Sequence, residues 1–344
     1  MTLRSYVITR ILLTIPMIFL LLSIVFLVLR VLPGDPARLH FGERAVKPET
    51  LIALRHALGT DKPIVNQYFD YLIGLLHGDL GKSMADFSPV TQQVMSAFPA
   101  TLELAIYATA IAVTLGILLG VRASRRYNHP EDHMIRAYGI ISYAIPVFYL
   151  GMVFQLTLGL GLHWFPTGGR TYPGMEPTGF HWGNLHFATG LYTIDSLLEG
   201  SPPKFFTALR YLFLPSLTLG IVLSGVFVRL TRINMLETLR MDFVTAARAR
   251  GIKERTITYT YALKNAFLPV LTMMGLQFAA LLAGAVLTET TFSWPGLGRY
   301  LVERISLRDY TAVQGAVVFF ALLVASVSLI VDILYAYFDP RIRL

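Results

Sequence analysis

The chain has 344 residues, of which 54% are hydrophobic and only 15% are charged. Soluble globular proteins carry about 25% charged residues, so the composition indicates a membrane protein. The absence of cysteine excludes disulfides, thiolate metal sites and thiol nucleophiles. The net charge of +8 is expected to reflect membrane topology, because no soluble region remains that could bind nucleic acid.

The first apolar run, in residues 8–31, predicts an uncleaved membrane span with a cytoplasmic N-terminus. It is longer than the apolar core of a signal peptide, which has about 7–15 residues, and no small-residue cleavage site follows it. In the polar segment 32–97 acidic and basic residues nearly cancel, as expected of an external loop. Within this segment, residues 48–58 and 63–77 predict amphipathic helices, the second with Ile64, Tyr68, Leu72 and Leu75 on its apolar face.

Further apolar segments predict spans at 99–121, 137–162, 209–230, 268–290 and 311–337. Each is long enough to cross a hydrocarbon core of about 30 Å. Pro146 predicts a kink in the third span, and small residues such as Gly275 predict close helix packing by the fifth. Segments 163–208, with a short helix at 192–198, and 291–310 are predicted to be external. Lys and Arg exceed Asp and Glu in loop 231–267, which places this loop and both termini in the cytoplasm.

The predicted fold is therefore an all-α polytopic membrane protein with six transmembrane helices. Residues 1–98 comprise the first transmembrane helix and an external amphipathic helical segment. Residues 99–344 form a core of five transmembrane helices, which includes the external segment 163–208 and the cytoplasmic loop 231–267.

The loop 231–267 contains a candidate docking helix between two spans. Asp242 is a suitable N-cap, and Gly251 is suited to end the helix. Ala246 and Ala247 are expected to make one side slim, and Lys253 and the charged residues after it should lie in solvent. A short basic helix of this kind suits a groove on a partner, whereas a solvated loop would be the simpler alternative.

This stretch resembles the EAA loop of type I ABC importer permeases, whose consensus is E-A-A-x-x-x-G-x9-I-x-L-P. Thr245-Ala246-Ala247 corresponds to E-A-A, Gly251 to the glycine and YALK at 261–264 to I-x-L-P. Threonine in place of glutamate and lysine in place of proline are similar to the peptide/nickel branch. LPGDP at 32–36, LTETTFSWPGLGRYLVE at 287–303 and DPRIR at 339–343 extend the resemblance over nearly the whole chain.

The resemblance implies a type I ABC importer membrane domain that moves dipeptides or oligopeptides, with oligosaccharides, glutathione and nickel complexes as alternatives. It implies a second homologous permease subunit, two cytoplasmic ABC ATPases that hold ATP and Mg, and an extracytoplasmic solute-binding protein. This chain would bind no cofactor or metal and catalyse no reaction, and it would lie in the cell membrane of a prokaryote. The residues expected to couple to the ATPase are Arg240, Asp242, Thr245, Ala246, Ala247, Arg248, Arg250, Gly251, Lys253 and Glu254.

Other polar residues predict further sites. Gln277, Glu103 and Glu289 lie close to bilayer depth, where polar groups are functional candidates because their burial is costly. In the external loops, the predicted docking residues for a binding protein are Asp35, Asp61, Lys62 and Trp294. HGDLGKS at 77–83 follows Leu76, where a P-loop would need its first glycine, so the segment predicts a turn. A self-contained secondary transporter or channel is the alternative class, but it would predict a proton relay or repeats with broken helices.

Overall fold

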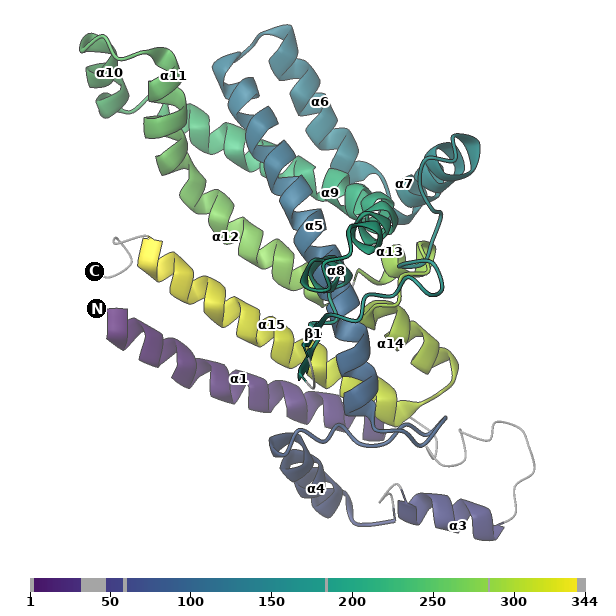
Figure 1. The fold of residues 1–344 in the computed structure, drawn as a ribbon. Helices are drawn as coiled ribbons and strands as arrows, with labels where there is room; N and C mark the ends of the chain where they lie inside the picture. Colours follow the sequence, from purple (N-terminus) through teal and green to yellow (C-terminus); the bar gives the residue numbers. More distant parts are fainter. Residues whose placement is uncertain (1–2, 32–47, 58–60, 183–184, 284, 339–344) are drawn as a thin grey trace.

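The computed structural model describes residues 3–31, 48–57, 61–182, 185–283 and 285–338, and most of them are helical (Figure 1). Within these residues, five helices are long and apolar enough to cross a membrane, and a bent pair would make a sixth span. The membrane-crossing elements are α1 (Leu3–Val31), α5 (Val90–Arg125), α9 (Pro202–Thr238), α12 (Leu263–Leu282), α15 (Tyr310–Phe338) and the pair α6 (Pro130–Ala144) with α7 (Val147–Phe154). The prediction of a helical membrane protein with several spans is confirmed, with five to six candidate spans in the described residues.

The third span is broken, where the sequence predicted only a kink. Helices α6 and α7 meet at an angle of 100°, and a π-helix, η1 (Gln155–Gly161), continues α7. The break lies at Ile145 and Pro146, both of which have extended backbones. Proline has no N–H to donate and disfavours a helical conformation at the preceding residue, so the two effects together end α6.

Other boundaries also differ from the hydropathy pattern. Helix α9 is longer than predicted, and the fifth span begins before α12 with α11 (Glu254–Thr256) and a π-helix, η2 (Ile257–Ala262). The fifth span ends at Leu282 rather than at 290, since α13 (Val286–Thr291) is a separate helix. The predicted third external loop contains α14 (Leu297–Ser306). Hydropathy averages over a window and does not register a break of a few small residues.

The segments that were predicted to be external contain the expected short helices. Helices α3 (Pro48–Ala57), α4 (Ile64–Leu76) and α8 (Tyr192–Leu198) form where the sequence places them. In α4, Tyr68, Leu72 and Leu75 are half-buried, but Ile64 in the first turn is 62% exposed, contrary to the predicted face. A small antiparallel hairpin, β1 (Phe180–Trp182) and β2 (Leu185–Phe187), was not anticipated.

Helix α5 is the centre of the bundle, and α9 packs against it along much of its length (Figure 1). Their backbones approach closely because glycines lie at the contact: a Cβ on Gly116 would overlap the Cβ of Phe227, and one on Gly120 would lie 2.6 Å from the Cβ of Thr231. The fifth and sixth spans pack in the same way, since a Cβ on Gly275 would overlap the side chain of Val331. This confirms the predicted role of small residues in helix packing.

Replacing Gly116 with alanine should destabilise the bundle by about 1–3 kcal/mol, because the added methyl group must push α9 away from α5. The measurement is the thermal unfolding midpoint of the purified chain in detergent. Ala110→Val is a matched control, since it enlarges an exposed position on the same helix. Equal midpoints for the two variants would show that the α5–α9 contact is looser than the structure has it.

Candidate coupling site

The loop between α9 and α12 carries α10 (Asp242–Ala249), which lies beyond the ends of the long helices, at the upper left of Figure 1. The chain reverses after Thr238 through backbone hydrogen bonds from Arg240 N to Glu237 O (3.1 Å) and from Met241 N to Thr238 O (3.1 Å). Met241, with an extended backbone, is the N-cap, so the prediction that Asp242 caps the helix is wrong by one residue. Asp242 is the first helical residue, where its negative charge still favours the helix N-terminus.

Gly251 ends α10 as predicted. Its φ is +73°, a conformation that side chains with a Cβ rarely adopt. Gly251 N donates to Arg248 O (2.9 Å) and Ile252 N donates to Ala247 O (3.2 Å), the hydrogen-bond pair of a Schellman motif. The turn satisfies carbonyls at the end of α10, and the chain then returns to the helical bundle through η2 and α12.

Replacing Gly251 with alanine should destabilise this turn by about 1 kcal/mol, since a Cβ meets no atom within 4 Å and only the backbone conformation is penalised. We expect amide hydrogen exchange in residues 249–252 to increase about fivefold. Arg250→Ala, at a neighbouring position with a φ of −82°, serves as the control and should change exchange much less. Similar rates in both variants would show that the turn does not depend on glycine.

The two sides of α10 have different environments. Val244 and Ala247 are buried and pack with Ile252 and Ile257, whereas Ala246 is exposed. The prediction of one slim side formed by Ala246 and Ala247 is therefore wrong, because consecutive residues of a helix point about 100° apart. The exposed side consists of Asp242, Phe243, Thr245, Ala246 and Ala249.

Two exposed apolar residues at this site were missed in the sequence. Met241 is 48% exposed and Phe243 is 39% exposed, although both are large and apolar. Helical periodicity could have identified them, because they lie outside the i, i+3 spacing of Val244 and Ala247, which face inward. Met241 and Phe243 therefore add apolar side chains to the exposed surface of the loop.

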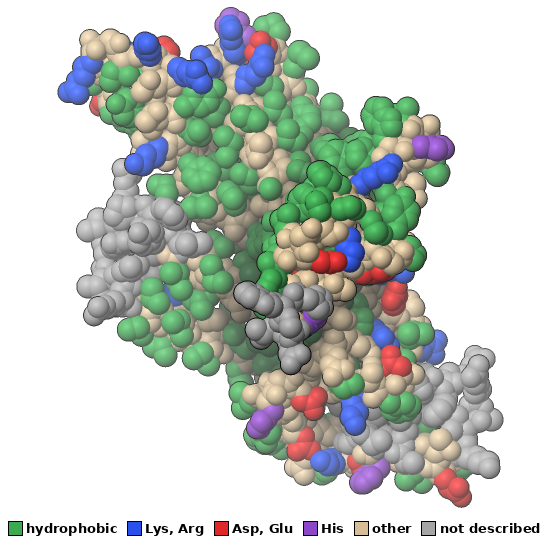
Figure 2. Space-filling view, viewed as in Figure 1, with side chains coloured by type: hydrophobic (Ala, Val, Ile, Leu, Met, Phe, Trp, Pro, Cys, Tyr) green, Lys and Arg blue, Asp and Glu red, His purple; other side chains and the backbone are tan. Residues whose placement is uncertain are grey.

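The charged residues of the loop divide into paired and unpaired groups. Arg248 Nε lies 2.7 Å from Glu254 Oε1, so these two side chains neutralise each other across the turn. Arg240, Arg250 and Lys253 are exposed and form no ion pair within the described part of the chain. Figure 2 shows Lys and Arg gathered at the upper end of the molecule, over α10 and the turn between α5 and α6. The surface around α10 is therefore basic.

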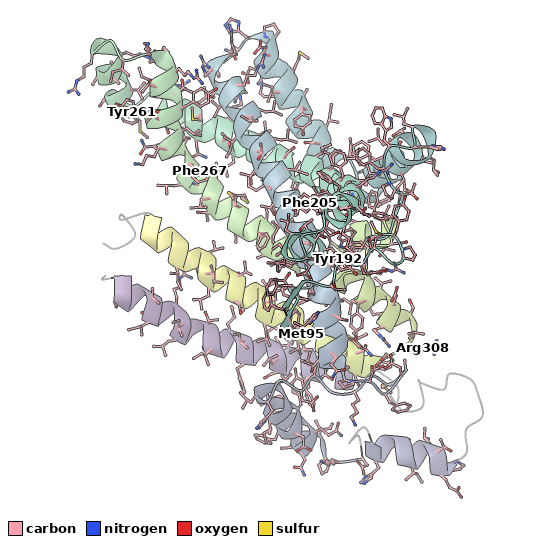
Figure 3. The ribbon with its side chains drawn as sticks, viewed as in Figure 1. Met95, Tyr192, Phe205, Tyr261, Phe267 and Arg308 are labelled. Atoms are coloured by element: carbon pink, nitrogen blue, oxygen red, sulfur yellow. The ribbon has the colours of Figure 1, made fainter. Side chains whose placement is uncertain are left out.

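The inner side of α10 connects the loop to three long helices. Ile257, which packs on Val244 and Ala247, is the first residue of η2, and η2 continues into α12. Next to it, Met235 of α9 and Ala262 and Ala266 of the fifth span pack on Val121 of α5. Tyr261 and Phe267 mark this descending segment in Figure 3. Close-packed side chains therefore connect the region of α10 to α9, α12 and α5.

Glu103 and Glu289, predicted near the pathway, are both engaged inside the chain. Glu103 is 2% exposed; it accepts hydrogen bonds from Arg170 NH2 (2.6 Å), Thr193 N (2.7 Å) and Thr193 Oγ1 (2.8 Å). Glu289 is fully buried and accepts from Thr101 Oγ1 (2.7 Å) and Arg299 N (2.9 Å). Burial raises the pKa of Glu289 despite these donors. In this conformation both carboxylates connect α5 to segments that were predicted to be external.

The remaining predicted residues do not form one site in the described part of the chain. Gln277 is half-buried on α12. Asp61 and Lys62 are exposed and pair with His56 (2.8 Å) and Asp70 (2.5 Å). Trp294 is fully buried and its Nε1 donates to Ala100 O (2.8 Å), so it cannot serve as a docking residue in this conformation. Asp35 lies outside the described residues.

The segment HGDLGKS forms a turn, as predicted, with Gly78 and Gly81 at positive φ. Ser83, its last residue, donates to the buried Asp309 (2.6 Å), which holds the turn against the start of α15. Among the residues that the structure describes, no group of histidines and carboxylates has the arrangement of a metal site.

A family model for the inner membrane component of binding-protein-dependent transport systems matches residues 112–344. A model for the N-terminal part of such membrane components matches residues 3–105. The chain belongs to this family. It is the multi-pass membrane component of a binding-protein-dependent transport system, so a self-contained secondary transporter or channel is not favoured.

Similar proteins include three permeases that align over almost their whole length. The chain is 40% identical over 341 residues to the di/tripeptide transport system permease protein DppB of Pseudomonas aeruginosa (strain UCBPP-PA14), with 98% of both chains covered. It is 38% identical over 341 residues to the dipeptide permease DppB of Escherichia coli (strain K12), again with 98% of both covered. The glutathione permease GsiC of Pectobacterium atrosepticum is 35% identical over 339 residues, covering 98% of this chain and 99% of GsiC. The resemblance to the peptide/nickel branch is confirmed.

Proposed function

We propose that this permease is one half of the membrane pathway of an ATP-driven importer of short peptides, and that α10 is its contact with a cytoplasmic ABC ATPase. The observation that carries the proposal is the geometry of α10. It is exposed on one side, anchored on the other, and joined at both ends to long helices of the bundle. The exposed Phe243 and the unpaired basic residues near it supply the apolar and charged groups that such a contact would use.

ATP hydrolysis would drive transport through this contact. Met241 and Phe243 would enter an apolar cleft of the ATPase, while Arg240 and Arg250 would meet acidic side chains at its rim. Closure of two ATPases on ATP would move α10, and Val244 and Ala247 would transmit the movement to η2 and the fifth span. ATP must bind the two states with different affinities for this to shift their populations. ATP and Mg would be held by the ATPases alone.

The proposed orientation places α10 and both termini in the cytoplasm, following the excess of Lys and Arg in loop 231–267. A second, homologous permease subunit would complete the pathway. A solute-binding protein would dock on the opposite side, where the networks of Glu103 and Glu289 hold the external segments rigidly against α5. Asp61 and Lys62 remain candidate docking residues there.

Short peptides are the proposed substrate class because the relatives above are named for dipeptides, di/tripeptides and glutathione, which is itself a tripeptide. The test is uptake of a labelled dipeptide by proteoliposomes containing this chain, its partner permease, the ATPases and the binding protein. We expect uptake to require ATP. Unlabelled dipeptides should compete with the labelled dipeptide, whereas oligosaccharides and nickel complexes should not. Uptake without the ATPase subunits would contradict the proposal.

A further inference from the structure

A large groove lies between α6 and α9, apart from α10 and from the external networks. Its volume is about 740 Å³, and its walls include Arg136, Ile140 and Tyr143 of α6 and Val226 and Arg229 of α9. Two glycines allow the helices to meet at its base: a Cβ on Gly225 would lie 2.5 Å from Gly139 O. The groove is therefore formed by the packing of the two helices.

The groove is apolar along most of its length and open to the surroundings. Ile140 is 71% exposed and Tyr143 is 70% exposed, so the described part of the chain does not cover them. Both lie within α6, one of the elements that cross the membrane, which means that lipid or another membrane protein must cover them. From Arg136 to Tyr143 the groove follows α6 for about 10 Å, at a rise of about 1.5 Å per residue.

The end of the groove nearest the coupling loop is basic. Arg136, Arg229 and Arg232 lie there, and the one carboxylate among them is the buried Asp132. Asp132 accepts both Nε (2.6 Å) and NH2 (2.8 Å) of Arg232, while it lies 3.9 Å from Arg136 Nε. Arg229 is exposed and pairs with no carboxylate in the described residues. One carboxylate cannot neutralise three guanidinium groups, so the groove keeps a positive charge at this end.

We propose that the groove binds an anionic phospholipid from the membrane leaflet on the α10 side. Its phosphate lies at Arg136 and Arg229, and one acyl chain follows Ile140 and Tyr143. Basic pockets between transmembrane helices recognise acidic headgroups, and tyrosine prefers the membrane–water interface. A lipid is favoured over a protein partner because three guanidinium groups share one carboxylate, which leaves positive charge for a phosphate at the membrane surface. The proposal does not depend on which substrate is imported.

The first test is a titration of the delipidated transporter complex with fluorescent phosphatidylglycerol and, separately, phosphatidylcholine. We expect Arg136→Gln with Arg229→Gln to weaken phosphatidylglycerol binding about thirtyfold, the effect of losing two interfacial cations. Arg136→Lys with Arg229→Lys should retain most of the binding, since the charge remains. Arg125→Gln with Arg126→Gln, at the end of α5 on the same side but outside the groove, should bind normally. Equal affinity for both lipids, or no effect of the glutamine pair, would overturn the proposal.

A second test identifies the occupant directly. The chain has no cysteine, so Ile140→Cys provides a single site for a photoreactive maleimide label when the partner subunits are also cysteine-free. In proteoliposomes with phosphatidylglycerol, we expect the label to crosslink to lipid, and the Arg136 and Arg229 glutamine pair to reduce that product. Crosslinking to the second permease subunit instead would show that the groove is a subunit interface and that the lipid assignment is wrong.

Discussion

Replacing Arg170 with methionine should lower the free energy of unfolding by about 3–5 kcal/mol, the cost of removing one partner of a buried ion pair. The side chains of Arg170 and Glu103 are 8% and 2% exposed, and their closest atoms are 2.6 Å apart. Without Arg170, Glu103 would keep only the two donors of Thr193 for a charge that has no access to water. Arg170 also lies 3.8 Å from the ring centre of Tyr192 on α8 and would lose that cation–π contact.

The measurement is denaturant unfolding of the purified chain in detergent, with Arg122→Met as the control. Arg122 also pairs with a glutamate, Glu131, but the two side chains are 65% and 42% exposed. Exposed pairs contribute about 0–1 kcal/mol, so the control should change stability little. In Arg170→Met with Glu103→Gln, part of the lost stability should return because no unpaired charge remains. Equal losses in the Arg170 and Arg122 variants would contradict the burial of this network.

Replacing Phe243 with aspartate should reduce substrate-stimulated ATP hydrolysis and uptake about thirtyfold, the effect of losing an interface anchor worth about 2 kcal/mol. The side chain is exposed in the isolated chain, so α10 itself should remain folded. Hydrogen exchange across residues 242–252 is expected to be unchanged, which separates a lost contact from a lost helix. Phe243→Leu retains an apolar side chain and should retain most of the coupling.

Val244→Asp gives the complementary result, because Val244 is fully buried on the inner side of α10. We expect this change to increase hydrogen exchange throughout residues 242–252 and to abolish coupling by unfolding the helix. If Phe243→Asp leaves hydrolysis and uptake normal while Val244→Asp abolishes both, the exposed side of α10 is not the contact surface.

Much of the fold could be predicted from local properties of the sequence. Hydropathy located the membrane spans. The end of α10 was also predictable, because a residue with positive φ is needed there and Gly251 adopts that conformation. The chain breaks at Pro146 rather than kinks because Ile145 is also extended. The sequence did not predict this, since a window of hydropathy does not distinguish a bent span from a straight one. Asp242 was misplaced by one residue because its side chain suits the N-cap and the first turn almost equally well.

The networks of Glu103 and Glu289 could not be predicted from sequence spacing. Glu103 and Arg170 are 67 positions apart, and Thr101 and Glu289 are 188 positions apart, so only the tertiary fold brings each pair together. Trp294 was predicted as a docking residue in an external loop, yet its indole is buried in the core beside Ala100. Predicting that Phe243 lies on the exposed face of α10 would have required knowing which residues of α10 pack against η2.

The most direct test of the coupling assignment is a cysteine crosslinking scan along α10 in the assembled complex. The chain has no cysteine of its own, so each introduced residue reports one position. Cysteines at Thr245, Ala246 and Ala249 should crosslink to an ATPase subunit, whereas cysteines at Val244 and Ala247, which face η2, should not. The same pattern should depend on nucleotide if closure moves the helix. Crosslinks to the ATPase from all five positions alike, or from none, would contradict a docked helix with one exposed contact face.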